Sequence, residues 1–203
     1  MVNERVNIRD KHGSTKRVAK VLLVVFSIIL VLLIVFAAGY LLKKPTYVEV
    51  FLVNPIGELV VANTNAEGVV NVPAVIEQAV IEFDSDYINY ILAALGTGYL
   101  HKSILGGNPF LELVLEDETW HAEIIKGMPN SALGSIDDED LRITLSKEEA
   151  VKAILSEDVG QFMKDSYSSG NLGIDMVANK AELFAKGYLD MYKELTGEEI
   201  SVE

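Results

Sequence analysis

The feature that most constrains this chain is an uncharged apolar run at residues 21–42, VLLVVFSIILVLLIVFAAGYLL, which holds one serine. A helix of about 20 apolar residues crosses the hydrocarbon core of a bilayer. Six Lys and Arg precede the run within residues 1–20, and only Lys43 and Lys44 follow it closely. Because the more basic flank normally stays in the cytoplasm, the sequence predicts a single-pass signal-anchor in the cell membrane. Its basic tail at 1–20 is expected to be cytoplasmic and its C-terminal domain extracytoplasmic.

A cleaved signal peptide is the alternative for the same run. The apolar core of such a peptide is normally about 7–15 residues long. Val35-Phe36-Ala37 offers a weak cleavage site, and the chain has no Cys for lipid attachment. The length of the run favours an uncleaved transmembrane helix at 21–42.

Charge separates the two parts of the chain. Residues 1–44 carry eight Lys and Arg against two Asp and Glu, whereas residues 45–203 carry nine against 28, a net charge of −19. An acidic domain repels phosphate backbones, so we expect no nucleic-acid partner. The lack of Cys excludes disulfide bonds and thiolate chemistry.

Residues 43–104 form a membrane-proximal segment in this interpretation. The stretches TYVEVFLV at 46–53 and ELVVA at 58–62 read as two strands of a hairpin, because the residues between them, 54–57, suit a type I turn. Helices are predicted at 73–82 and at about 85–95.

From Pro109 onward, apolar and polar residues alternate in four stretches. These are FLELVLE, TWHAEII, DLRITLS and GNLGIDM, at 110–116, 119–125, 140–146 and 170–176. Each stretch has one apolar and one mostly polar face, as an antiparallel sheet covered on one side requires. Two short helices are predicted between the third and fourth strands, and a final helix at about 180–195. The sequence therefore predicts an α+β domain whose mostly antiparallel sheet is covered on one face by helices.

Two stretches resemble the sterol carrier protein type 2 family. They are DLRITLSKEEAVKAILSEDVGQFMKDSYSSGNLGIDM and GGNPFLELVLEDETWHAEIIKG, the second with Trp120 early in its second strand. The resemblance covers about residues 105–195 and identifies 105–203 as a lipid-binding region. In that family an apolar tunnel between the sheet and the C-terminal helices holds a lipid. The resemblance implies that this chain holds a membrane lipid, sterol or other hydrophobic ligand by its acyl or isoprenoid chain, with the final helix as a lid.

The expected lipid-binding residues are the apolar positions of the strands and helices that would line such a tunnel. They are Leu111, Leu113, Trp120, Ile143, Phe162, Met163, Leu172, Ile174, Met176, Phe184, Tyr188 and Met191. A packed core is the alternative for the same residues, since apolar stripes are usually core. Gly187, in the middle of the predicted final helix, indicates close approach or mobility there.

No catalytic pattern stands out in the sequence. His12, His101 and His121 are spread out, with no pair at metal-ligand spacing on a helix. The acidic run 137–140 lacks the spacing of a calcium loop and reads as a solvated turn. We therefore predict neither an enzyme nor a bound cofactor or metal.

These features favour a membrane-anchored, non-catalytic lipid-binding domain. Two alternatives share the same fold. One is a packed scaffold that binds another envelope protein, and the other is an accessory subunit that presents lipid to an enzyme.

Overall fold

The computed structural model describes residues 23, 25–35, 47–103, 107–116 and 118–198. The chain divides into two units, Met1–Lys44 and Pro45–Glu203. In the first unit, residues 23 and 25–35 are helical. Across the described ranges, no helix combines the length and apolar character needed to cross a bilayer. Part of the predicted span at 21–42 and all of the basic tail at 1–20 lie outside those ranges, so both stay predictions.

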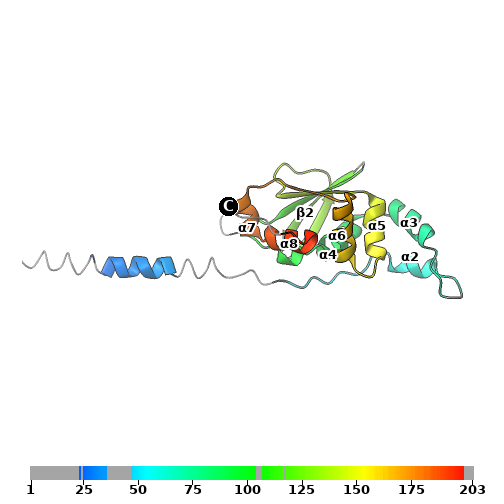
Figure 1. Ribbon diagram of the computed structural model, residues 1–203, viewed down its shortest axis with the longest axis horizontal. Helices are drawn as coiled ribbons and strands as arrows, with labels where there is room; N and C mark the ends of the chain where they lie inside the picture. Colours follow the sequence, from blue (N-terminus) through cyan, green and yellow to red (C-terminus); the bar gives the residue numbers. More distant parts are fainter. Residues whose placement is uncertain (1–22, 24, 36–46, 104–106, 117, 199–203) are drawn as a thin grey trace, which may run out of the picture. The chain divides into compact units, whose positions relative to one another are not determined.

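The second unit is an α+β fold built on one five-stranded sheet (Figure 1). Its strands are β1 (Phe110–Leu115), β2 (Glu118–Ile125), β3 (Met128–Leu133), β4 (Leu141–Leu145) and β5 (Gly173–Met176). Before the sheet come α2 (Gly57–Ala62), α3 (Val72–Ile81), α4 (Ser85–Ala94) and the 3₁₀ turn η1 (Thr97–Tyr99). The remaining helices are α5 (Lys147–Leu155), α6 (Val159–Ser169), α7 (Lys180–Lys186) and α8 (Tyr188–Thr196).

The strand order is β3-β2-β1-β4-β5. Three of the four pairings are antiparallel, and β1 pairs with β4 in parallel. Leu113 lies opposite Trp120 on one side and Ile143 on the other. The predicted α+β fold with a mostly antiparallel sheet is confirmed, and the parallel pair makes the sheet mixed.

The alternation of the strands places one apolar face of the sheet against the helices, which lie on one side of it in Figure 1. On that face, Leu111, Leu113, Leu115, Ile143 and the other inward side chains are almost completely buried. All core residues belong to the second unit. That unit therefore contains the apolar burial needed to fold by itself.

The predicted hairpin at 46–62 is wrong in both of its strands, as far as the structure describes them. Residues 57–62 form helix α2, and 47–53 belong to no strand. The extended segment is instead held at one point, where the Val48 N–H donates to the Gly98 carbonyl at 2.9 Å. Gly98 permits this approach, because a Cβ there would lie 2.1 Å from the Val48 carbonyl oxygen.

The edge strand β3 was not predicted. Its sequence MPNSAL lacks a clean apolar alternation. Helix α4 satisfies part of its outer edge, because the Asn89 side chain accepts the Ser131 N–H at 3.1 Å and the Ser131 hydroxyl donates to the Ser85 carbonyl at 3.2 Å. The edge of the sheet is thereby covered rather than left open for another strand.

The predicted final helix is two helices, which break at Gly187 with φ 89°. A Cβ at this position would lie 2.3 Å from the Tyr99 carbonyl oxygen. The break turns α7 relative to α8, so Phe184 is 64% exposed although Tyr188 and Met191 are buried. The expectation of close approach at Gly187 is confirmed, and Phe184 does not share a buried face with Tyr188 and Met191.

The acidic run at 137–140 is not wholly a solvated turn, because Glu139 and Asp140 are buried. Glu139 pairs with Arg142. Asp140 pairs with Lys186 at 2.6 Å. Burial alone would lower the pKa of Lys186, but its hydrogen bonds to Asp140 and Glu182 outweigh burial and raise it. This buried pair fixes the end of α7 to the start of β4.

Candidate apolar ligand site

A wide-open apolar cavity of about 620 Å³, closer to a surface groove than to an enclosed pocket, lies between α2, α3, α5 and α6, away from the sheet. We call it cavity 1. Its apolar lining consists of Ile56, Val60, Val70, Val72, Ile76, Ile154, Leu155 and Phe162. Its polar lining consists of Asn54, Lys152, Ser156 and Glu157. This volume lies within the roughly 300–1,000 Å³ that small-molecule sites occupy, and the mostly apolar walls are typical of such sites.

Local hydrogen bonds shape the wall made by α2, α3 and the turn between them. The Asn54 side chain accepts the Ile56 N–H at 3.0 Å, which sets the entry to α2. In the turn, the Asn65 side chain accepts two backbone N–H groups, and Thr64 pairs with Val70 across it. The Asn71 side chain then caps α3. These caps place Val60, Val70 and Ile76 on the same cavity.

The opposite wall comes from α5 and α6. Ser146 caps α5 by accepting the Glu149 N–H at 3.0 Å, and Asp158 caps α6 by accepting the Gln161 N–H at 2.9 Å. The bond at Ser146 is the first of the two hydrogen bonds that make up a capping box. The short connection between the two helices sets Leu155 and Phe162 on the cavity.

A second cavity of about 590 Å³, cavity 2, shares Ile76 with the first. Its other lining residues are Pro73, Glu77, Val80, Ile81, Glu116, Lys147 and Glu148. The Lys152–Glu148 ion pair, at 2.6 Å, joins a residue of cavity 1 to a residue of cavity 2. The two cavities therefore adjoin across the contact between α3 and α5.

The lysine of cavity 2 is already engaged by a carboxylate outside the cavity. Lys147 Nζ lies 2.8 Å from Glu118 Oε1. The hydrogen bond from Lys147 lowers the pKa of the Glu118 carboxyl, because it favours the ionised form. The Lys147 ammonium is therefore already paired with the Glu118 carboxylate of β2.

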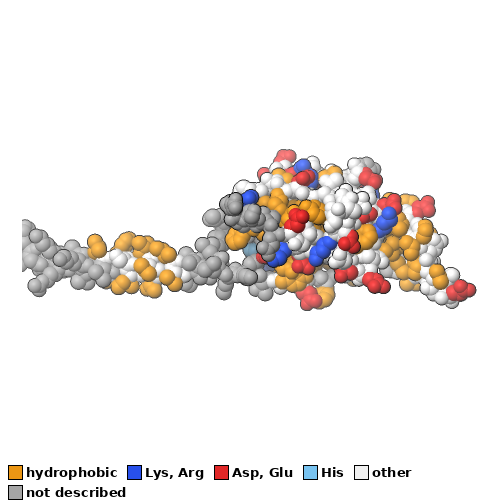
Figure 2. All heavy atoms as spheres, viewed as in Figure 1, with side chains coloured by type: hydrophobic (Ala, Val, Ile, Leu, Met, Phe, Trp, Pro, Cys, Tyr) orange, Lys and Arg blue, Asp and Glu red, His pale blue; other side chains and the backbone are white. Residues whose placement is uncertain are grey.

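Hydrophobic side chains gather on the surface over α2 and α3, with acidic side chains around them (Figure 2). Val61 is 76% exposed and Ile81 is 79% exposed, both on the outside of these helices. The apolar character of this end of the domain therefore extends from the cavities to the surface.

Most of the twelve predicted lipid-binding residues lie in the packed core instead of on a cavity. The buried members are Leu111, Leu113, Trp120, Ile143, Met163, Leu172, Tyr188 and Met191. Ile174 and Met176 pack against that core, and Phe184 is exposed. Among the twelve, all of which the structure describes, only Phe162 lines cavity 1 or cavity 2.

Helix α4 shares the core with the apolar face of the sheet. Ile88, Ile91 and Leu92 of this helix are completely buried in the same cluster as Leu113 and Ile143. The side chains between sheet and helices thus pack closely, as the packed-core alternative expects.

The residues that the sequence interpretation missed belong to α2, the turn after it and α3. Val60 was not predicted as a site residue because 58–62 reads as a strand, and Val70 lies in the turn after α2, where no element was predicted. The signal for the α3 wall is present, since Asn71 and Pro73 mark the start of a helix whose Ile76 reaches both cavities.

Comparison with known proteins gives solved structures only. No family model matches the chain, and no curated protein matches it either. The inverting sec-alkylsulfatase Pisa1 from Pseudomonas sp. is similar with a TM-score of 0.30 and 16% identity, over 64% of this chain and 17% of that enzyme. The chain therefore spans only a small part of the sulfatase.

Two sterol carrier protein type 2 structures are also similar. The ubiquinone synthesis protein UbiJ-SCP2 has a TM-score of 0.34 and 10% identity, over 57% of this chain and 93% of that one. Sterol Carrier Protein 2 Like 2 from Aedes aegypti has a TM-score of 0.32 and 19% identity, over 54% and 96% of the two chains. These matches name the same family as the sequence resemblance. Similarities of this size say nothing about a ligand or an activity.

Proposed function

We propose that the domain at 45–203 is a non-catalytic binder of a single-chain hydrophobic ligand, which it holds in cavity 1. The observation that carries this proposal is the cavity of about 620 Å³ with eight apolar side chains on its wall. Burying an acyl chain is favourable by about 0.8 kcal/mol for each CH₂ removed from water. Chain length should therefore dominate the affinity of the ligand.

The polar lining of cavity 1 supports a binding role without turnover. Its members are Asn54, Lys152, Ser156 and Glu157. Lys152 is held by Glu148, and Ser156 donates its hydroxyl to the Ala153 carbonyl at 2.6 Å. The serine proton is thus directed to the backbone and not to a general base, as a nucleophile would require. A purified domain that hydrolysed or modified any lipid would contradict the non-catalytic assignment.

The experiment that tests ligand binding is native mass spectrometry of residues 45–203, purified without detergent and mixed with monomyristoylglycerol. This probe carries one acyl chain and no charge. We expect one bound molecule for each chain, because cavity 1 has a mostly apolar wall, whereas half of the residues that line cavity 2 are charged. A chain that stays bare at all probe concentrations would overturn the proposal, and the packed scaffold would then account better for the fold.

We further propose that residues 21–42 anchor this domain in a membrane, with the tail at 1–20 on the cytoplasmic side. The support is the uncharged apolar sequence and its basic flank. After carbonate extraction, the full chain is expected in the membrane pellet and residues 45–203 in the supernatant. Release of the full chain would contradict the anchor.

A further inference from the structure

We propose that the ligand of cavity 1 is a single-chain amphiphile with a cationic head, such as an alkylammonium, and that the site discriminates against fatty-acid carboxylates. This inference rests on the proposed function and adds the chemical class of the ligand. It follows from the side chains around the two adjoining cavities and from how their charges are already paired.

Carboxylates outnumber cations at the cavities. Cavity 1 carries Glu157 and Lys152, and cavity 2 carries Glu77, Glu116, Glu148 and Lys147. Both lysines are engaged, Lys152 by Glu148 at 2.6 Å and Lys147 by Glu118 at 2.8 Å. An anionic head would have to compete with these glutamates for a lysine.

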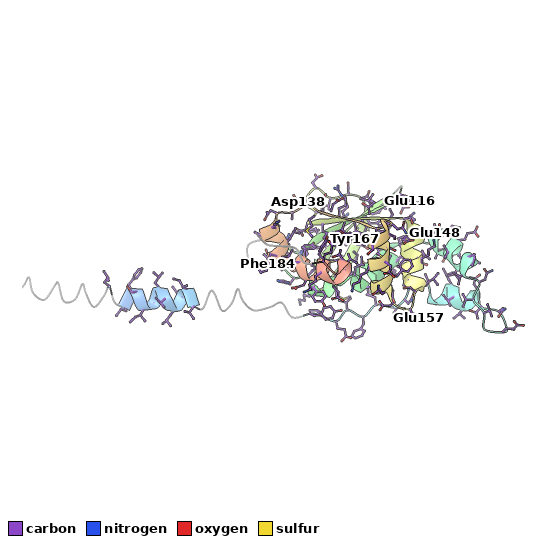
Figure 3. All side chains as sticks on the ribbon, viewed as in Figure 1. Glu116, Asp138, Glu148, Glu157, Tyr167 and Phe184 are labelled. Atoms are coloured by element: carbon purple, nitrogen blue, oxygen red, sulfur yellow. The ribbon has the colours of Figure 1, made fainter. Side chains whose placement is uncertain are left out.

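The remaining carboxylates are accessible to a head group. Glu77, Glu116 and Glu157 are exposed to solvent. Glu116, Glu148 and Glu157 lie around the end of the domain that carries α3 and α5, whereas Asp138 and Phe184 lie at the other end (Figure 3). A ligand whose tail fills cavity 1 would place its head among carboxylates on either side of Ile76, because that residue lines both cavities.

The charge of the whole domain acts in the same direction. Residues 45–203 have a net charge of −19, which attracts cations and repels anions over distances of about a Debye length. This wider field and the local carboxylates can be separated experimentally, because acidic residues far from the cavities contribute to the field alone.

The test compares three probes of equal chain length on residues 45–203, namely tetradecyltrimethylammonium, monomyristoylglycerol and myristate. Binding is measured by calorimetry at low salt, at about pH 8 and below the micelle concentration of each probe. Each exposed charge pair contributes little by itself, but several together should make the ammonium roughly tenfold tighter than myristate. Added salt should reduce this preference.

Two double variants separate the effect of the carboxylates at the cavities from the effect of the net charge of the whole domain. E77Q with E157Q removes two carboxylates of the cavities, and D137N with D138N removes two charges from the 134–140 loop, which has no residue on either cavity. We expect the first pair to reduce the preference for ammonium at least threefold and the second to change it little. Myristate binding as tightly as ammonium, or equal loss of preference in both pairs, would overturn this inference. If monomyristoylglycerol and both charged probes all fail to bind, the proposed function fails as well.

Discussion

Replacing Asp140 with alanine is expected to reduce the free energy of unfolding of residues 45–203 by about 3–5 kcal/mol, because it leaves the buried ammonium of Lys186 without its main partner. The two side chains are 2% and 5% exposed, and their charged atoms lie 2.6 Å apart. Asp140 Oδ2 also accepts the Phe110 N–H at 2.8 Å and lies 3.1 Å from the Tyr188 hydroxyl. The loss therefore affects β1, β4 and α8 together. Urea unfolding followed by circular dichroism measures it.

Two controls make this prediction specific. D138A removes a neighbouring exposed carboxylate and is expected to change stability by less than about 0.5 kcal/mol. Combining D140A with K186M removes both charges and should lose less stability than D140A alone, since no buried lysine is then left with the half-exposed Glu182 as its partner. If D140A unfolds at the same urea concentration as D138A, the buried Asp140–Lys186 pair does not fix α7 and α8 to the sheet.

Replacing Gly187 with alanine is expected to destabilise the domain by about 3 kcal/mol or more, through two effects that add. Gly187 has φ 89°, a conformation that costs an L-residue roughly 1–2 kcal/mol. Its new Cβ would also lie 2.3 Å from the Tyr99 carbonyl oxygen and 3.1 Å from His101 Nδ1. The adjoining backbone cannot easily move away, because the His101 N–H donates to the Lys186 carbonyl at 3.0 Å.

Gly197 provides the matched control for Gly187. It has φ 75° at the end of α8, and beyond its chain neighbours no atom of the described residues lies within 4 Å of the position that its Cβ would take. G197A should therefore show only the conformational cost of about 1–2 kcal/mol. Similar losses in G187A and G197A, measured by urea unfolding, would show that the approach to Tyr99 does not restrict the α7–α8 junction.

The sequence identified the elements whose side chains alternate most clearly. In β1, β2, β4 and β5, most polar residues alternate with apolar residues, and a shift of the strand by one position would expose those apolar side chains. Strand β3 was not predicted because Pro129 and Asn130 interrupt its apolar alternation. The strand is held by α4 through the Asn89 side chain, and no local sequence pattern predicts that contact. Helix α2 was predicted as a strand because Leu59, Val60 and Val61 favour strands. Packing of Leu59 in the core stabilises the helix instead.

The cavity could not be predicted in the same way. Apolar stripes indicate which residues turn inward, and Leu113, Ile143, Tyr188 and Met191 do so. Whether such residues close-pack or leave a space depends on how side chains from several elements fit together, and that fit has no periodic signature. Only Phe162 was both predicted from its stripe and found on a cavity wall.

The matched pair V60W and V61W tests most directly whether the ligand occupies cavity 1. Val60 lines the cavity, whereas Val61, its neighbour in α2, is 76% exposed and does not line it. Native mass spectrometry with monomyristoylglycerol should show one bound molecule for each chain in the wild type and in V61W, and a clearly smaller bound fraction in V60W, whose indole would occupy part of the cavity. Equal binding in V60W and V61W would contradict the claim and direct the search for the ligand elsewhere in the domain.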